Sequence, residues 1–459
     1  MSHEVDGQHL SSIDTAWYRM ESQTNHANIG GVLVFDEPLD FERVRELVQE
    51  RFVEQFAHFR NRVVESPGRL TRPRWEADPD FSLDYHVQRV TLPEPGDHAT
   101  LQRKASALMT RALDLDRPLW RIYQIDNCNG GSVLLAQLHH CMGDGFALAR
   151  VLLSIVDEGH GFDAPIADPD ETGSKAHQSI PSRVARELEH QLLDSEGRHE
   201  LVEEIRDLAG ELGHIVLMSF DPKTVLKRDL DGRLQVAWTS GHDLEGLKQL
   251  ARDLDYTLND VLMAGVTGAL RRYLTECGEP VDEIEIRAIV PVNLRPARTI
   301  EEMEAVLGNE FGLVFLQLPI DTADMDERLR VVKERIEKLK QSPEAIVAFG
   351  ILTAEGMASG IVEHIIHEIF ARKASLVVSN VPGPKEELRF AGKPLKDLMF
   401  WVPHPGPHLG LGISLISYAG NVSIGVRADT AVVSDPDELV GYIEDEFEAM
   451  RGRIQNSES

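Results

Sequence analysis

The spacing of apolar residues predicts strands alternating with helices along the first part of the chain. Val32-Leu-Val-Phe35 has the pattern of a strand, and helical spacing follows at Phe41, Val44, Leu47, Val48 and Phe52. Ser132-Val-Leu-Leu-Ala-Gln-Leu138 predicts a buried strand because it is apolar over nearly its whole length. From Phe146 to Val156 only Arg150 and Ser154 are polar, which predicts a nearly buried helix.

The second half returns to this alternation after a polar interruption. Residues 159–182, rich in Pro, Gly, Asp and Ser, predict a surface linker, and the charged stretch 183–212 predicts a helical crossover. Thr257-Leu-Asn-Asp260 begins a predicted helix to Leu274 with the pattern of a capping box. Strands are expected at 284–292, 311–318 and 374–378, and a hairpin at 412–426 turns at Tyr418-Ala-Gly-Asn421.

Length and these interruptions together predict two domains. At 459 residues the chain is too long for one ordinary hydrophobic core and suits two domains of roughly 200 residues each. The predicted boundaries are 1–160 for the first domain, 161–230 for a linker and crossover helix, and 231–459 for the second domain.

Composition restricts the partners and the compartment. A formal net charge of -29 argues against nucleic acid and against electrostatic capture by an anionic membrane. The three cysteines show neither pairing nor metal-ligand spacing, which favours a reduced cytoplasmic compartment. The N-terminus lacks the pattern of a signal peptide, and the longest apolar runs fall short of the roughly 18 residues of a spanning helix. Contact with the inner membrane or with lipid inclusions is therefore expected to be peripheral.

The residues that suggest chemistry are His139-His140-Cys-Met-Gly-Asp144-Gly145, between the buried strand and the buried helix. Such a loop can hold a polar side chain rigidly and still present it to a cleft. A neutral imidazole can accept a hydroxyl proton near neutral pH, and Gly145 allows a tight turn into the helix. The alternative interpretation is a pair of buried histidines that only satisfy the core.

Other chemistries have weaker support in the sequence. No GxSxG motif is present, so a serine hydrolase has no nucleophile elbow. Cys141 adjoins His140, but neighbours in sequence rarely face each other as a nucleophile and its base would. Glu363-His-Ile-Ile-His367-Glu resembles a metal-binding helix only loosely, and we predict no metal site.

The chain resembles the bacterial bifunctional wax ester synthase/acyl-CoA:diacylglycerol acyltransferase family. HHCMGDG fits the family's HHxxxDG signature, and further motifs follow in the family's order from about Leu10 to Met450. The HHxxxDG signature also occurs in the condensation domains of peptide synthetases, so the order of the motifs carries the resemblance. The other matching segments are Leu10-Ser-Ser-Ile-Asp14, Gly30-Gly-Val-Leu-Val-Phe35, Pro118-Leu-Trp120, Asn259-Asp260, Pro291-Val-Asn-Leu-Arg295-Pro, Leu307-Gly-Asn309 and Ser379-Asn-Val-Pro-Gly-Pro384.

The resemblance implies the fold of the chloramphenicol acetyltransferase superfamily. This is an α/β fold with mixed sheets in two domains and a substrate tunnel between them. The implied substrates are acyl-CoA and a long-chain alcohol or diacylglycerol, transfer is direct, and no cofactor is needed. Two alternatives remain open at this point: a condensation-type enzyme using carrier-bound acyl groups, and a non-catalytic protein of lipid surfaces.

Roles for the site residues follow from the resemblance and from their chemistry. His140 is the expected general base, and His139 is expected to support the loop. Asp144 is expected to form a salt bridge with Arg295 that fixes the loop. The other candidates are Asn259 for the oxyanion, the acceptor or mere helix capping; Pro118 and Trp120 as a site wall or as core; and Asn380, Pro382 and Gly383 in a rigid turn beside the cleft.

Overall fold

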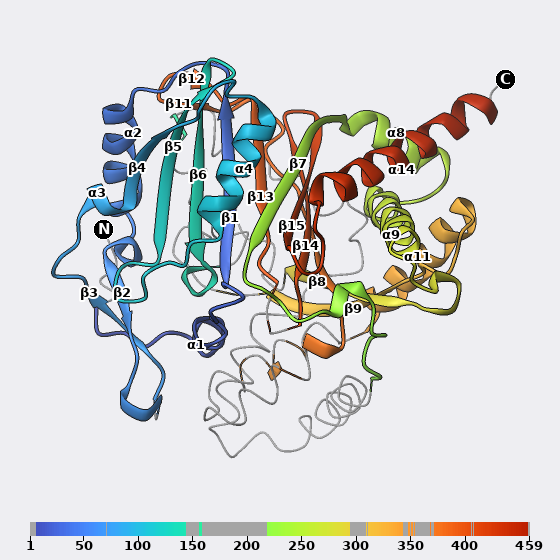
Figure 1. Ribbon diagram of the computed structural model, residues 1–459, viewed down its shortest axis with the longest axis horizontal. Helices are drawn as coiled ribbons and strands as arrows, with labels where there is room; N and C mark the ends of the chain where they lie inside the picture. The colour runs from blue at the N-terminus through green and yellow to red at the C-terminus, as the bar shows by residue number, and fades with distance from the viewer. Residues whose placement is uncertain are drawn as a thin grey trace.

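A computed structural model describes residues 6–69, 71–143, 156–157, 218–293, 309, 311–342, 348, 350–351, 353, 368, 371–404, 406 and 408–457. Two sheets lie side by side with helices packed around them (Figure 1). The first part of the chain contains α1 (Ser12–Arg19), β1 (Asn28–Phe35), α2 (Phe41–Val48), β2 (Asn61–Val64), β3 (Arg74–Ala77), α3 (Leu83–His86), β4 (Val87–Thr91), α4 (His98–Met109), β5 (Trp120–Cys128) and β6 (Gly131–His139).

Among the described residues of the second part of the chain, the strands and longer helices run from Leu234 to a long final helix. Its elements are β7 (Leu234–Asp243), α8 (Leu244–Asp253), α9 (Leu258–Glu276), β8 (Ile286–Asn293), β9 (Phe311–Leu318), α11 (Met325–Lys340), β10 (Leu376–Val381), β11 (Arg389–Phe390), β12 (Lys393–Pro394), β13 (Asp397–Trp401), β14 (Leu411–Tyr418), β15 (Asn421–Asp429) and α14 (Pro436–Ser457). Short helical turns lie at Gln49–Val53, Ala57–Phe59, Pro67–Arg69, His140–Met142, Val225–Lys227 and Val281–Glu283.

The first sheet has the strand order β13-β1-β6-β5-β4. Only its β4–β5 pair is parallel, and β6 at its centre is buried along its whole length, as its apolar sequence predicts. The edge strand β13 comes from the second half of the chain and pairs antiparallel with β1, with Gly31 opposite Phe400 (Figure 1). The first sheet is therefore completed by residues far along the sequence.

The second sheet has the order β7-β15-β14-β10-β8-β9 and is also mixed. Strand β10 runs parallel to both β8 and β14, while the remaining pairs are antiparallel. Helices α9, α11 and α14 pack on one another, and α14 also contacts β7 and β15. The predicted α/β class with mixed sheets in two domains is confirmed, whereas the tunnel and the domain boundaries stay predictions.

Local sequence signals explain several element boundaries. The capping box at α9 forms as predicted, because the Thr257 side chain accepts from the Asp260 N–H and the Asp260 carboxylate accepts from the Thr257 N–H. The predicted hairpin forms between β14 and β15, where Ala419 and Gly420 have φ values of 47° and 81°. The predicted strands near Val32, Ser132, Ile284 and Phe311 are also present.

One predicted segment differs, and others lie outside the described residues. Ser379–Val381 was expected within a turn but forms the end of β10, because these backbone groups pair with β14. The predicted helix over 146–156 lies outside the described residues except for Val156, and so do the linker 159–182 and the crossover helix 183–212. Within the ranges that the structure describes, no helix is long and apolar enough to cross a membrane.

Buried polar bonds join the two halves beside the end of β6. Arg427 of β15 is fully buried, and its guanidinium donates to the backbone carbonyls of His26, at 2.9 Å, and Asn28. The Asn25 amide donates to the carbonyls of His404 and Gly406, each at 2.6 Å. The segment that leads into β1 is thus held by the second half of the chain.

Candidate active site

The histidine pair lies where β6 ends, as the sequence predicts. His139 is the last residue of β6, and His140 begins a short 3₁₀ turn. The His139 N–H donates to the Leu119 carbonyl at 2.9 Å, and the His140 N–H donates to the Ala27 carbonyl at 2.8 Å. Two separate segments therefore fix the backbone of the pair.

The ring of His140 is enclosed by aromatic side chains from both halves of the chain. Trp17 of α1 stacks on it with centroids 3.8 Å apart and an interplanar angle of 7°, and Phe311 of β9 lies at 5.6 Å. The residue is only 7% exposed, and this burial lowers the pKa of His140 to about 3. The imidazole is therefore neutral at physiological pH, which is the form that accepts a proton.

The backbone carbonyl of His140 is held by a side-chain bridge. The Nδ2 of Asn309 donates to this carbonyl at 2.8 Å and to Oδ1 of Asp14 at 2.7 Å. Asp14 is buried in the first turn of α1, where the helix N-terminus stabilises its charge. The bridge connects the histidine loop to both halves of the chain.

His139 has a different environment, which indicates a supporting role. Its Nδ1 accepts from the Cys141 N–H at 3.2 Å, so the ring proton lies on Nε2, which faces a Glu21 carboxylate oxygen at 3.5 Å. Glu21 also accepts from the Ala27 N–H and from Nδ1 of His26, both at 2.7 Å. Although burial acts to raise it, bonds from the histidines lower the pKa of Glu21 to about 2, so this carboxylate stays ionised.

Buried neutral histidines make stability fall as the pH falls. Burial lowers the pKa of His140 to about 3, that of His86 to about 4, and that of His404 well below its usual range. Between these values and the ordinary 6.5, the unfolded chain binds protons that the folded protein does not. We expect the free energy of unfolding, and with it the urea midpoint, to drop between pH 7 and pH 5; the free energy should fall by up to about 1.4 kcal/mol per pH unit for each histidine. A midpoint that is constant over this range would contradict the burial of these rings.

The Pro118-Leu-Trp120 motif belongs to the core. Pro118 and Trp120 are both buried, and the Trp120 indole donates to the Phe59 carbonyl at 3.0 Å and stacks on His86. Between them, Leu119 supplies the carbonyl that binds the His139 N–H. Of the two interpretations left open by the sequence, core packing has the support of these contacts, and the motif positions the histidine strand through its backbone.

Two of the predicted motifs meet beside the second sheet. The Asn380 amide at the end of β10 donates to Oδ1 of Asn259, in the first turn of α9, at 3.3 Å, and both residues are half-buried. Pro382 is also half-buried. The Gly383 N–H donates to the Ser417 hydroxyl, and a Cβ at Gly383 would lie 2.1 Å from the Ser417 carbonyl oxygen, so this close approach requires glycine.

The structure does not bring this second group into direct contact with His140. Within the described part of the chain, the ring and backbone contacts of His140 involve Ala27, Gly143, Asn309, Trp17 and Phe311 rather than Asn259 or Asn380. The role of Asn259 at the oxyanion or the acceptor therefore stays a prediction.

Three predicted site residues lie outside the described residues: Asp144, Gly145 and Arg295. The expected Asp144–Arg295 salt bridge accordingly stays a prediction. Residues 363–367 of the loose metal-helix pattern are outside as well.

Cys141 is an unsuitable nucleophile in this environment. Its thiol is buried, and burial raises the pKa of Cys141 well above its usual value. A thiol that stays protonated at neutral pH is a poor nucleophile, which supports the sequence-based preference for histidine chemistry.

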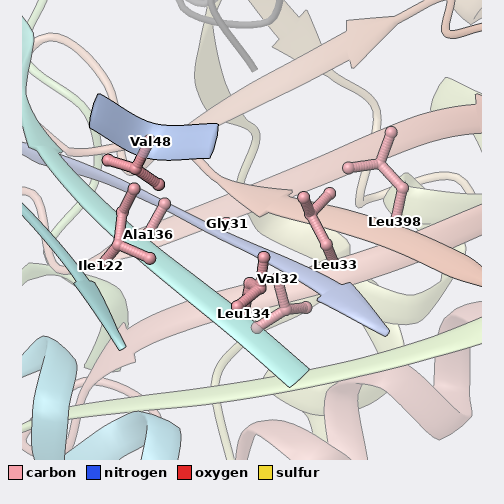
Figure 2. A pocket seen from close by; sticks show the side chains of 8 residues that line it. All are labelled: Gly31, Val32, Leu33, Val48, Ile122, Leu134, Ala136 and Leu398. Atoms are coloured by element: carbon pink, nitrogen blue, oxygen red, sulfur yellow. The ribbon is translucent and has the colours of Figure 1, made fainter. Parts of the chain in front are cut away.

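A small apolar pocket lies on the first sheet under α2 (Figure 2). Its lining comes from β1, α2, β5, β6 and β13: Gly31, Val32, Leu33, Val48, Ile122, Leu134, Ala136 and Leu398. Successive side chains of a strand point to opposite faces of the sheet. Along β6, Leu134 and Ala136 are on the face opposite to that of His139, so the pocket lies on the other face of this strand. No titratable side chain lines it, and the candidate chemistry therefore remains at His140.

Sequence reasoning missed the residues that surround the histidines. Glu21, Trp17 and Phe311 were not among the candidates, and Asp14 and Asn309 appeared only within motifs of the resemblance. The one sequence signal for Asp14 and Asn309 was their place in the motifs Leu10–Asp14 and Leu307–Asn309. Both are polar residues that become buried, and a buried polar residue needs a hydrogen-bond partner.

Comparison with protein families gives two successive matches along the chain. The wax ester synthase/diacylglycerol acyltransferase catalytic domain matches residues 10–262, and the C-terminal domain of the same family matches residues 307–451. The first match includes the histidine pair, and the two matches together include all strands of both sheets except β8.

Curated relatives match over nearly the whole chain. A probable diacylglycerol O-acyltransferase of Mycobacterium tuberculosis is 28% identical over 459 residues, covering 95% of this chain and 94% of the relative. A putative diacylglycerol O-acyltransferase of Mycobacterium bovis shows the same identity and coverage.

Solved structures share the fold. The wax ester synthase/diacylglycerol acyltransferase from Marinobacter aquaeolei VT8 has a TM-score of 0.69 at 23% identity, over 97% of this chain and 99% of that one. The first condensation domain of the calcium-dependent antibiotic synthetase has a TM-score of 0.62 at 17% identity, over 98% and 96% of the two chains. Both likenesses concern the fold alone.

Two mixed sheets, with a histidine pair at the end of the buried central strand of the first, are the fold of a two-domain acyltransferase. Because the catalytic-domain model matches more than half of its residues, the chain belongs to the wax ester synthase/diacylglycerol acyltransferase family. The resemblance seen in the sequence is thereby confirmed.

Proposed function

We propose that this protein transfers the acyl group of acyl-CoA to the hydroxyl group of a long-chain alcohol or a diacylglycerol, with His140 as general base. The observation that carries the proposal is the neutral ring of His140, held at the end of β6 between Trp17 of the first half and Phe311 of the second. A base placed where two halves of a protein meet can be approached by two different substrates.

The proposed reaction is a direct transfer. His140 removes the proton from the acceptor hydroxyl as its oxygen attacks the thioester carbonyl, and a tetrahedral oxyanion forms. Collapse of this intermediate breaks the carbon–sulfur bond and expels the CoA thiolate, which takes the proton from the imidazolium. A positioned histidine base accelerates such a step about 10²- to 10⁴-fold.

The burial of His140 keeps the ring unprotonated before the reaction and favours the second proton transfer, whereas the lowered pKa makes the imidazole a weaker base in the first. An imidazole with a pKa of about 3 is unprotonated before the reaction and releases its proton readily afterwards. The CoA thiolate is a far stronger base, since thiols have an ordinary pKa of about 8.5. The enclosed ring also keeps water away from the thioester, which disfavours hydrolysis.

Long-chain acceptors and their esters partition into lipid. We therefore propose that the protein meets them by peripheral contact with a membrane or a lipid inclusion rather than by spanning a bilayer. Within the described ranges there is no helix suited to spanning.

An acceptor panel tests the proposal. With palmitoyl-CoA as donor, we expect CoA thiol release to depend on a long-chain alcohol or a diacylglycerol, with one ester formed for each thiol. Thiol release with water alone and no ester would indicate a thioesterase. Transfer only from an acyl-carrier protein would favour the condensation-type alternative, whose fold is similar.

A further inference from the structure

The carbonyl of His140 is held by side chains that no motif assigns to the reaction. Asn309 Nδ2 lies 2.8 Å from this carbonyl and 2.7 Å from Oδ1 of Asp14. All three residues are buried, so these bonds are shielded from competing water. A single amide group thus connects the catalytic loop, α1 and the entrance to β9.

The same two segments also hold the ring of His140. Trp17 lies three residues after Asp14 on α1, so the two side chains share a face of the helix. Phe311 lies two residues after Asn309, where β9 begins. The His140 carbonyl is therefore held by Asn309, whose amide is in turn bound by Asp14, and the His140 ring is held by Trp17 and Phe311.

We propose that Asn309 and Asp14 are positioning residues for His140: by fixing its carbonyl, they aim its imidazole at the acceptor hydroxyl. The proposal rests on the assignment of His140 as the base. Asp14 orients the Asn309 amide, and the second N–H of that amide reaches the loop. A displacement of the base by about 1 Å can lower turnover by on the order of 10²-fold.

The first variant is Asn309→Asp, whose carboxylate has nearly the same shape as the amide of asparagine but cannot donate a hydrogen bond. It places a carboxylate opposite both the Asp14 carboxylate and the His140 carbonyl. We expect kcat to fall about 10- to 100-fold while KM for palmitoyl-CoA and for the acceptor stays within about threefold, because the base moves but the binding surfaces do not. The melting temperature should also fall.

A matched control exists elsewhere between the two halves. Gln102 of α4 is buried and donates from Nε2 to Oδ1 of Asp437, in α14, at 2.8 Å. Gln102→Glu makes the same change from amide to carboxylate opposite an aspartate, away from His140. It should lower the melting temperature and leave kcat within about threefold of wild type.

The double variant Asp14→Asn with Asn309→Asp separates positioning from folding. The exchange restores an amide–carboxylate pair, so much of the lost melting temperature should return. The carboxylate at position 309 still cannot donate to the His140 carbonyl, so kcat should stay at least tenfold below wild type. A purely structural role predicts instead that kcat returns together with the melting temperature, and that result would overturn the proposal.

The remaining outcomes are also decisive. His140→Ala is measured in parallel, so an active His140→Ala protein would reject the base assignment itself. An inactive His140→Ala protein with a fully active Asn309→Asp protein would reject only the positioning role. A rise in KM at unchanged kcat would assign Asn309 to substrate binding, and failure of both Asn309 variants to fold would assign it to stability; either result overturns the proposal.

Discussion

Replacing His140 by alanine is expected to remove nearly all turnover while leaving the protein folded. In the proposed mechanism the imidazole accepts the hydroxyl proton, and the loss of a positioned general base lowers the rate about 10²- to 10⁴-fold. The backbone bonds of His140 to Ala27 and Asn309 do not involve the ring, so the loop should keep its place. Ester formation from palmitoyl-CoA, followed by product analysis, measures the loss.

His139→Ala is the matched control, because it removes the neighbouring ring of the same kind. Its Nε2 faces Glu21 and its Nδ1 accepts from the Cys141 N–H, so we predict that it supports the loop and takes no part in the proton transfer. We expect at least tenfold more activity from this variant than from His140→Ala. Activity of His140→Ala within tenfold of wild type, with thermal unfolding unchanged, would refute the general-base assignment.

Replacing Arg427 by methionine is expected to lower the free energy of unfolding by about 3–5 kcal/mol. The guanidinium is fully buried and donates to the carbonyls of His26 and Asn28, which the methionine would leave unsatisfied. Burial lowers the pKa of Arg427 to about 10, while the charge of Glu21 acts to raise it. Loss of this cation would leave the Glu21 carboxylate buried with less compensation, and urea unfolding at pH 7 measures the effect.

Arg272→Met provides the comparison for Arg427. Arg272 is nearly half-exposed and pairs with Asp445 at the surface, where ion pairs contribute about 0–1 kcal/mol. The loss of unfolding free energy for Arg427→Lys should lie between the losses for Arg427→Met and Arg272→Met. Lysine keeps the positive charge but lacks the planar guanidinium group that donates to two carbonyls. A loss below about 1 kcal/mol for Arg427→Met would mean that water or neighbouring groups satisfy both carbonyls.

Predictions from the sequence were successful where the signal is local. The buried strand before His139, the capping box at Thr257 and the hairpin turn at Gly420 each depend on residues within a few positions of one another. Ser379–Val381 was misplaced because proline and glycine follow it at once, and their turn signal concealed the pairing of these residues with β14.

The environment of His140 depends on contacts between distant parts of the chain. The stacking of Trp17 on the His140 ring joins segments about 120 residues apart, and the bridge from Asn309 to Asp14 joins segments 295 residues apart; no periodicity gives a signal for either contact. Trp120 shows the same limit, because its sequence fits a site wall and a core residue equally well until its contacts with Phe59 and His86 are known.

The pairing of β13, from the second half of the chain, with β1 of the first sheet has a consequence for synthesis on the ribosome. Strand β1 has β6 on one side but needs Asp397–Trp401 on the other, so its open edge persists until those residues have emerged. About 260 residues separate the end of β6 from the end of β13, which at 5–20 residues per second is roughly ten seconds to a minute. An unpaired strand edge can recruit other chains, so the nascent protein should depend on chaperones during this interval.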